Sequence, residues 1–172
     1  MKEVKVLRLG HRPSRDKRLT THVGLVARAL GADGIILDEK DPKIEKSIID
    51  VAGRFGGDFS FGVEEKWRKL IKNWSGKTIH LSMYGQKIQE LESELRKITD
   101  RLLIILGSEK VPGEVYEIAD YNVAVTNQPH SEVAALAILL DRLYEGKKLE
   151  EEFDGELKII PSEEDKIVKE KD

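Results

Sequence analysis

The sequence predicts an α/β fold of three layers, in which a largely parallel sheet is covered by helices on both faces. Short apolar runs rich in Val, Ile and Leu alternate about six times with segments whose apolar residues recur at helical spacing. Gly, Pro, Asp and Asn separate these segments and favour turns. With 172 residues, the chain is long enough for one ordinary domain with a single core.

The same patterns give the elements in chain order. The predicted strands cover residues 4–9, 33–37, 59–61, 78–83, 102–106, 122–125 and 156–160. The predicted helices cover residues 20–30, 42–52, 64–74, 88–98 and 131–145. Each strand is a short run with many β-branched residues, whereas each helical segment carries an apolar stripe on one side.

Turn and capping residues set the ends of the first elements. A polar loop at 10–19 follows the first strand, and Thr20 or Thr21 is expected to cap the next helix. Gly31 ends that helix. Asp41, which directly precedes a proline, opens the second helix, and a glycine-rich segment closes it.

The stretch from 101 to 145 is the most informative part of the chain. One strand leads into a glycine-bearing loop at 107–113, and the next leads into a polar loop at 126–130. Ser131 can cap the following helix, with Glu132 in its first turn, where negative charge is favourable. Because open α/β sheets bind ligands at the carboxyl ends of their strands, the two loops predict a ligand site.

The chain is expected to form one domain at 1–146, followed by an acidic extension at 147–172. About the last dozen residues are mostly charged and are expected to be mobile. The sequence has no cysteine, which excludes Cys-based catalysis and metal binding. No apolar run is long enough to span a membrane and the amino terminus is charged, so a cytoplasmic protein is expected.

Charge is unevenly distributed, although the net charge is only −3 at pH 7. Residues 1–30 carry eight basic and two acidic side chains, whereas residues 145–172 carry six basic and eleven acidic ones. Clustered Arg and Lys bind phosphates and give salt-dependent affinity for RNA. A solvated surface is the alternative interpretation of such a cluster. The candidate RNA-binding residues lie on one loop: Arg12, Arg15, Lys17 and Arg18.

Common nucleotide-binding and metal-binding motifs are missing. The sequence has neither a Walker A motif nor GxGxxG, which disfavours a nicotinamide enzyme, and the loop GSEKVPG by itself also fits a plain turn. The four histidines have no metal-ligand spacing, so no metal is expected. His80 is interpreted as a strand residue with a satisfied partner. His130 is either a turn residue or a residue that places a ligand.

Several long segments resemble one known family. LGSEKVP, NVAVTNQPHSEVAALAI, GHRPSRDKRLTTHVGLVARALGADGI and HLSMYG closely resemble the archaeal tRNA (cytidine-56 2'-O)-methyltransferases of the SPOUT superfamily. These segments span most of residues 10–142. The resemblance implies S-adenosylmethionine-dependent methylation of the ribose of cytidine 56 in the tRNA T-loop. It also implies a deep trefoil knot in the C-terminal part of the sheet, and a homodimer formed through the knot region, in which the catalytic arginine often faces the cofactor of the other subunit. The helix at 134–143 fits burial in such an interface, and it would equally suit an ordinary core helix.

The resemblance also implies roles for particular residues. Arg28 is the candidate catalytic residue, with His22 at the position where related 2'-O-methylating enzymes have Asn. Because a guanidinium is very hard to deprotonate, Arg28 is interpreted as an electrostatic clamp rather than a base. The residues implied in S-adenosylmethionine binding are Leu81, Gly107, Ser108, Glu109, Lys110, Val111, Val125, Thr126, Asn127, Gln128, Pro129, His130, Ser131 and Glu132.

Two alternative functions stay open at this point. One is a methyltransferase of the same fold that acts on another RNA site or on a base atom. The other is an RNA-binding α/β module without catalysis, which the intact loops after the two strands disfavour. The sequence alone does not identify a general base.

Overall fold

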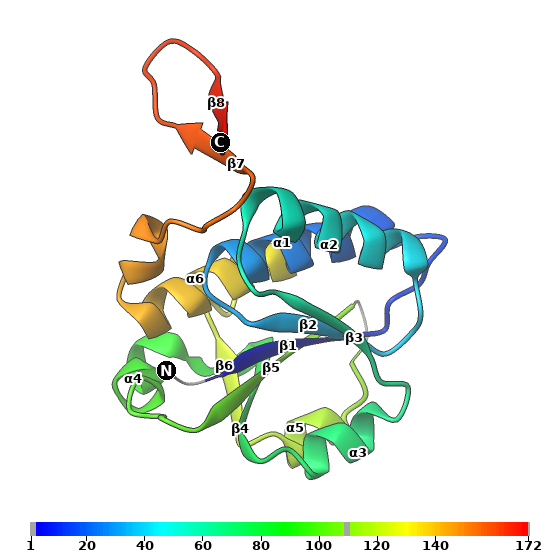
Figure 1. Cartoon of the computed structure of the whole chain (residues 1–172). Helices are drawn as coiled ribbons and strands as arrows, with labels where there is room; N and C mark the ends of the chain where they lie inside the picture. Colours follow the sequence, from blue (N-terminus) through cyan, green and yellow to red (C-terminus); the bar gives the residue numbers. More distant parts are fainter. Residues whose placement is uncertain (1–2, 109–110, 172) are drawn as a thin grey trace.

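The computed structural model describes residues 3–108 and 111–171, and its centre is a six-stranded sheet in which all pairs are parallel (Figure 1). The spatial order is β3-β2-β1-β5-β4-β6. The strands are β1 (Val4–Leu9), β2 (Gly34–Leu37), β3 (Ser60–Val63), β4 (Gly76–Lys87), β5 (Arg101–Gly107) and β6 (Tyr121–Ala124). The parallel α/β prediction is therefore confirmed.

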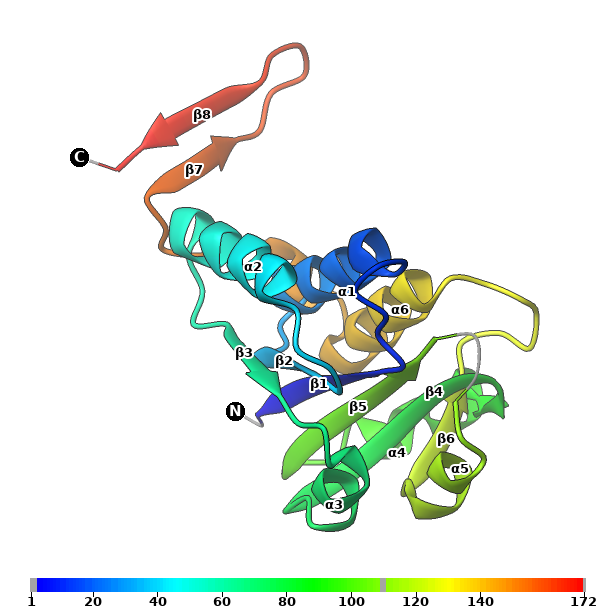
Figure 2. The same ribbon diagram turned by 90° about the vertical axis from the view of Figure 1, so that its right-hand side faces the viewer.

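Helices cover both faces of the sheet (Figures 1 and 2). The helices are α1 (Lys17–Ala29), α2 (Pro42–Phe55), α3 (Trp67–Lys72), α4 (Ile88–Leu95), α5 (Glu114–Ile118) and α6 (Glu132–Tyr144). One core contains buried residues of α1, α2, α4 and α6, and the other contains buried residues of α3 and α5. Within β1, Val4 and Val6 face the first core while Leu7 and Leu9 face the second, as strand alternation requires.

Two elements differ from the predictions in the first half of the chain. The helix predicted to start at Thr20 or Thr21 begins at Lys17, because residues 12–16 already form a tight turn. Thr20 is buried and its hydroxyl bonds the Nδ1 atom of His11 at 2.8 Å instead of capping the helix. The helix predicted at 64–74 is limited to α3, since Glu64 continues the backbone bonding of β3.

Three short elements were not predicted: the helix α5, the 3₁₀ helix η1 (Lys147–Glu150) and the strand β8 (Ile167–Glu170). The five-residue helix α5 lies between β5 and β6, and it is too short to produce a periodic pattern. The charged end of the chain, for which no strand was predicted, contains β8 (Ile167–Glu170), an antiparallel partner of β7 (Leu157–Ile160). Ile159 pairs with Val168 in this hairpin, and Ile160 with Ile167. These cross-strand pairs favour a strand in spite of the charged composition.

The extension packs on its own domain before the hairpin begins. After the short 3₁₀ helix η1 (Lys147–Glu150), the backbone of Gly155 crosses the end of α2 so closely that a Cβ there would lie 2.2 Å from the carbonyl carbon of Phe55. Only glycine fits such a crossing. Beyond it, β7 and β8 project from the body (Figures 1 and 2). In the described part of the chain, no helix has the length and hydropathy that crossing a membrane requires.

Candidate active site

A pocket of about 570 Å³ opens at the carboxyl edge of β4, β5 and β6. It lies where the sequence predicted a ligand site. Its lining residues are His80, Leu81, Ser82, Met83, Tyr84, Leu106, Gly107, Ser108, Val111, Tyr116, Val123, Val125, His130, Glu132 and Ala135. Apolar side chains with a few convergent polar groups are typical of sites for small organic ligands.

An interruption in the pairing of β4 with β6 forms one wall of this pocket. The two strands pair through Leu81 and Val123, then resume at Gln86, and the register shifts between these points. The residues inside the interruption line the pocket: Ser82, Met83 and Tyr84. An irregularity of this kind redirects side chains that would otherwise alternate along the strand.

The loop after β5 approaches the opposite wall without room for a side chain at its first position. A Cβ on Gly107 would lie 1.7 Å from the Cγ2 atom of Val111, so glycine is required for the loop to keep this course. Ser108 donates its backbone N–H to the carbonyl of Leu9 at 3.1 Å, which fixes the loop to the end of β1. Glu109 and Lys110, also predicted to bind the cofactor, lie outside the described residues.

The loop after β6 is shaped by its own polar groups. Asn127 donates its amide to the carbonyls of Met83 at 2.7 Å and Gly85 at 3.2 Å, which ties this loop to the interruption in β4. Ser131 accepts from the N–H of Val133 at 3.2 Å and caps α6 as predicted. Of the residues predicted to bind the cofactor, the structure brings seven into the pocket: Leu81, Gly107, Ser108, Val111, Val125, His130 and Glu132. The remaining described ones are exposed and do not line it: Thr126, Asn127, Gln128, Pro129 and Ser131.

A small polar cluster on the pocket wall was not predicted as part of the site. His80 was predicted to be a strand residue with a hydrogen-bond partner, and its Nδ1 atom lies 2.9 Å from the side-chain oxygen of Asn122. Burial lowers the pKa of His80, so its neutral form is favoured. The His80 ring meets Tyr116 edge-on at 4.6 Å, and the Tyr116 hydroxyl bonds Ser82 at 2.5 Å. The sequence patterns assigned Tyr116 to no element and gave no signal for this contact.

A buried ion pair joins β1 to the pocket. The Nη2 atom of Arg8 lies 3.1 Å from the Oε2 atom of Glu132, and the Arg8 side chain is 0% exposed. Arg8 also donates Nη1–H to the carbonyl of Leu9 at 3.1 Å. Arg8 was predicted only as part of a strand, although a cation inside the apolar run VKVLRL is a signal of a special environment.

The basic loop is anchored beside the same sheet edge. Asp38 accepts the backbone N–H groups of Gly10 at 2.6 Å and His11 at 3.2 Å. The buried His11 ring also lies 3.1 Å from the carboxylate of Asp41, the N-cap of α2. Arg12 pairs with Asp16 at 2.8 Å. The other three predicted RNA-binding residues are exposed: Arg15, Lys17 and Arg18.

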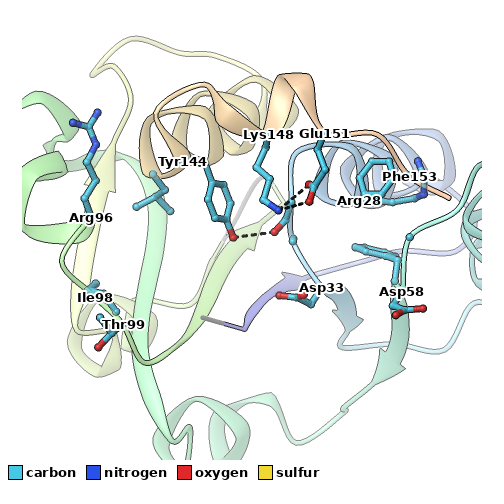
Figure 3. A pocket seen from close by; sticks show the side chains of 15 residues that line it. Arg28, Asp33, Asp58, Arg96, Ile98, Thr99, Tyr144, Lys148, Glu151 and Phe153 are labelled. Atoms are coloured by element: carbon cyan, nitrogen blue, oxygen red, sulfur yellow. Dashed lines mark hydrogen bonds and ion pairs between the residues drawn. The ribbon is translucent and has the colours of Figure 1, made fainter. Parts of the chain in front are cut away.

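Arg28 lies far from this pocket, in a second cavity of about 670 Å³ (Figure 3). The cavity is at the amino edge of the sheet, because residues one or two positions before β2, β3 and β5 line it: Asp33, Phe59 and Thr99. Arg28 is 8% exposed, and burial lowers its pKa. Its guanidinium donates to the carbonyl of Gly56 and lies 4.8 Å from the centroid of the Phe153 ring.

His22 and Arg28 lie on different sides of α1, although the resemblance groups them as candidate catalytic residues. His22 is exposed and borders a shallow depression with Lys17 and Arg18, whereas Arg28 is buried. Six residues correspond to about 1.7 helical turns, which places the two side chains on different sides. Within residues 3–108 and 111–171, no three potential metal-ligating side chains converge.

Solved structures with the same architecture include RNA-modifying methyltransferases. The chain matches the "A. aeolicus TrmH/SpoU tRNA modifying enzyme" with a TM-score of 0.63 and 17% identity, over 86% of this chain and 77% of that one. It matches the SpoU methyltransferase AviRb from Streptomyces viridochromogenes, solved with AdoMet, with a TM-score of 0.54 and 18% identity, over 84% and 58% of the two chains. The fold is therefore that of the SpoU/TrmH class of methyltransferases.

Sequence similarity identifies the family within this class. A sequence model described as "tRNA ribose 2'-O-methyltransferase, aTrm56" matches residues 55–169. A tRNA (cytidine(56)-2'-O)-methyltransferase of Pyrococcus horikoshii is 59% identical over 162 residues, covering 91% of this chain and 79% of that protein. One of Methanocaldococcus jannaschii is 56% identical over 170 residues, covering 96% and 95%. The chain belongs to this family of tRNA ribose 2'-O-methyltransferases.

Proposed function

We propose that this protein transfers a methyl group from S-adenosylmethionine to the ribose 2'-oxygen of cytidine 56 in the tRNA T-loop. The relatives that share more than half of their residues with it carry this activity in their names. The observation that carries the proposal is the pocket between the loops after β5 and β6, at the edge where such sheets bind ligands. The protein would act in the cytoplasm, where it would meet its tRNA substrate.

The residues of the pocket fit an adenosyl ligand. Leu81, Val125 and Leu106 supply apolar walls, while Gly107 lets the backbone of its loop come close to a flat ring. When bound, S-adenosylmethionine supplies the electrophilic methyl group. The protein must align this group with the ribose hydroxyl and exclude competing water, which is catalysis by positioning.

The basic loop is the proposed tRNA-binding edge. A Cβ on Gly10 would lie 2.6 Å from the hydroxyl of Ser108, so the basic loop starts directly beside the proposed cofactor loop. The exposed cations Arg15, Lys17 and Arg18 follow within one short segment. They would hold phosphates of a splayed loop nucleotide while its ribose enters the pocket, as sequence-specific readers of RNA loops commonly do.

The proposed catalytic role of Arg28 requires a second subunit. Arg28 and the pocket of the same chain lie at opposite edges of the sheet, so Arg28 would serve the pocket of a partner in a homodimer. Ile138 on α6 is 43% exposed and offers an apolar contact for such a dimer. The other large residues of α6 face the core of their own chain: Leu136, Leu139, Leu140 and Leu143.

Mixed dimers test this arrangement. Chains with Arg28→Ala and chains with a disabled pocket would be purified separately, mixed, and allowed to exchange subunits, with light scattering to measure the oligomeric state. Methyl transfer that is absent in each variant and recovers in the mixture supports action across the dimer. No recovery in verified mixed dimers would remove the proposed role of Arg28, and a monomer would remove the arrangement altogether.

The deep trefoil knot is likewise a proposal, supported by the family and by the way Asn127 ties the loop after β6 to Met83 and Gly85. When a knotted chain is pulled from its termini, the tightened knot retains some residues, and these do not contribute to the extended length. Pulling the protein from both termini should therefore give an unfolded contour length shorter than that of the free chain of 172 residues. A full contour length would contradict the knot.

Methyl transfer to defined tRNA tests the function directly. Labelled S-adenosylmethionine would be incubated with an unmodified tRNA transcript and with the same transcript carrying 2'-deoxycytidine at position 56. Label in the first transcript only is expected. Label in both would reject the site but keep the methyltransferase, and label in neither, without cofactor binding, would favour an RNA-binding module.

A further inference from the structure

The pocket contains a single acidic side chain and no Lys or Arg among the described residues that line it. That acidic residue is Glu132, on the first turn of α6. The remaining walls are apolar or carry neutral hydroxyl groups, apart from two histidines, of which His80 is held toward its neutral form by burial. An anionic group in a mostly apolar cavity attracts cations more strongly than it would in water.

Glu132 is held in place by the buried Arg8. Their closest atoms are 3.1 Å apart, but they are not aligned as a hydrogen bond. Three buried polar atoms of the pair therefore have no hydrogen-bond partner among the described residues: Nε and Nη2 of Arg8, and Oε2 of Glu132. The Oε2 atom of Glu132 is buried against Arg8, whereas the side chain as a whole keeps 24% exposure and lines the pocket.

The surroundings of Arg8 indicate why the pair is more than a link between two elements. Burial and the charge of Asp16 raise the pKa of Glu132, and the positive charge of Arg8 offsets part of this rise. Asp16 and Asp38 also act electrostatically on Arg8. Buried ion pairs contribute little net stability compared with well-packed apolar residues. A buried cation that favours the charged form of a pocket carboxylate would strengthen the binding of a positively charged ligand.

From this geometry we infer that Glu132 determines specificity for the cationic part of the methyl donor, and that Arg8 is a positioning residue that holds Glu132. This inference rests on the proposed function. S-adenosylmethionine carries two positive groups, the sulfonium and the α-ammonium, whereas S-adenosylhomocysteine keeps only the ammonium and 5'-methylthioadenosine has neither. The three compounds share the adenosine part, so they separate charge recognition from recognition of the ring.

Calorimetric titration of the three compounds against the wild type and Glu132→Gln tests the inference. The amide keeps the size of the side chain and removes its charge. Glu132→Gln should bind S-adenosylmethionine about tenfold more weakly, the effect of one charge-assisted contact, and 5'-methylthioadenosine unchanged. A loss shared by S-adenosylhomocysteine assigns the contact to the ammonium. A loss confined to S-adenosylmethionine assigns it to the sulfonium.

Two results would overturn the inference. Equal weakening of all three compounds would mean that the substitution damages the pocket, and no change for any of them would mean that the carboxylate does not meet the ligand. Wild-type protein that binds none of the compounds would instead reject the proposed function. Glu117→Gln, on the exposed side of the neighbouring helix α5, removes the same charge outside the pocket and should change none of the affinities.

The Arg8 side chain is fully buried, so substitutions of Arg8 can destabilise the fold. The variants must therefore distinguish loss of stability from loss of the position of Glu132. Arg8→Met leaves the Glu132 charge uncompensated and should unfold at lower temperature, whereas Arg8→Met combined with Glu132→Gln should regain much of that stability. The double variant should still show the weakened binding of S-adenosylmethionine. Arg8→Lys keeps a cation and should retain part of the preference for the charged ligand. A double variant with wild-type preference would contradict the role of both residues.

Discussion

Arg28 donates two hydrogen bonds to one acceptor, the carbonyl oxygen of Gly56, at 3.0 Å from Nε and 2.5 Å from Nη2. The same guanidinium stacks on Phe153 of the C-terminal extension. Arg28 thus connects the end of α1, the turn after α2 and the extension. This is a structural role, whether or not Arg28 also acts on a partner's substrate, and the two roles predict different results for substitutions.

Phe153→Ala and Arg28→Ala separate these roles. Loss of the Phe153 ring removes a cation–π contact worth about 1 kcal/mol and should lower the free energy of unfolding by that amount. Arg28→Ala also removes charge-assisted hydrogen bonds and should cost about 2 kcal/mol. Urea unfolding measures both values. At a temperature where both variants are folded, methyl transfer should fall far more in Arg28→Ala, and equal losses would assign Arg28 a structural role only.

The exposed part of the basic loop should set the salt dependence of tRNA binding. Removing one cation that binds a phosphate reduces the slope of log affinity against log salt by about 0.7 to 0.9. Arg15→Gln, Lys17→Gln and Arg18→Gln should each weaken binding and lower this slope, as filter binding across a salt series would show. Lys69→Gln, an exposed cation on α3 that lines neither the pocket nor the cavity around Arg28, is the matched control. A slope that stays at the wild-type value in all three variants would place the tRNA elsewhere.

Gly107→Ala should weaken cofactor binding without unfolding the protein. The added Cβ would meet Val111 at 1.7 Å, so the loop after β5 must shift away from the position that lines the pocket. We expect about a tenfold loss of affinity for S-adenosylmethionine, measured by calorimetry, which corresponds to about 1.4 kcal/mol. Gly113→Ala, where an added Cβ meets no atom within 4 Å, is the control in the same loop.

The sequence predicted the sheet well because its strands are continuous apolar runs, as Leu102 to Leu106 illustrates. It also predicted the cap at Ser131 and the position of the pocket, since these depend on local residue types. It could not predict that Tyr116 and Ser82 meet, or that Arg8 reaches Glu132. Such contacts depend on strand order and on the interruption in β4, which no local pattern records.

The placement of Arg28 shows a second limit of sequence reasoning. The resemblance implies that Arg28 is a catalytic residue, but a helix that follows β1 runs back along the sheet, so the end of α1 lies at the amino edge of its own chain. The direction of the chain alone separates Arg28 from the pocket. A sequence motif gives the residue type and its spacing, and the topology decides which edge of the sheet it reaches.

Asp41 should make the free energy of unfolding depend on pH in the acidic range. Burial raises its pKa, but hydrogen bonds from His11 and from the backbone of Ile44 and Lys43 outweigh this and leave the pKa lowered. A lowered pKa in the folded state contributes stability above the ordinary value of about 3.9, and this contribution disappears as the pH falls through the folded value.

Asp41→Asn isolates this charge because the amide can still cap α2. The variant should be less stable than the wild type at pH 6, and the difference should close as the pH falls below about 4. Urea unfolding across this range measures the difference. A constant difference over the whole range would show that the carboxylate charge makes no contribution.

Two truncations should have opposite consequences, because the extension consists of a docked part and a projecting part. Removal of residues 156–172 deletes β7 and β8, which pair with each other and project from the body. Two-stranded hairpins contribute little stability by themselves, so this variant should unfold within a few degrees of the wild type. Removal of residues 147–172 also deletes Phe153 and the close backbone contact of Gly155 with the end of α2.

The longer truncation should lower the unfolding temperature much further, because it exposes the cavity around Arg28 and leaves that guanidinium without its ring contact. Thermal unfolding followed by circular dichroism compares the two variants. If both lose the same stability, the hairpin rather than the docked segment stabilises the domain. If neither does, residues 1–146 form a self-sufficient unit, and the contacts of the extension serve tRNA binding or subunit contact instead of folding.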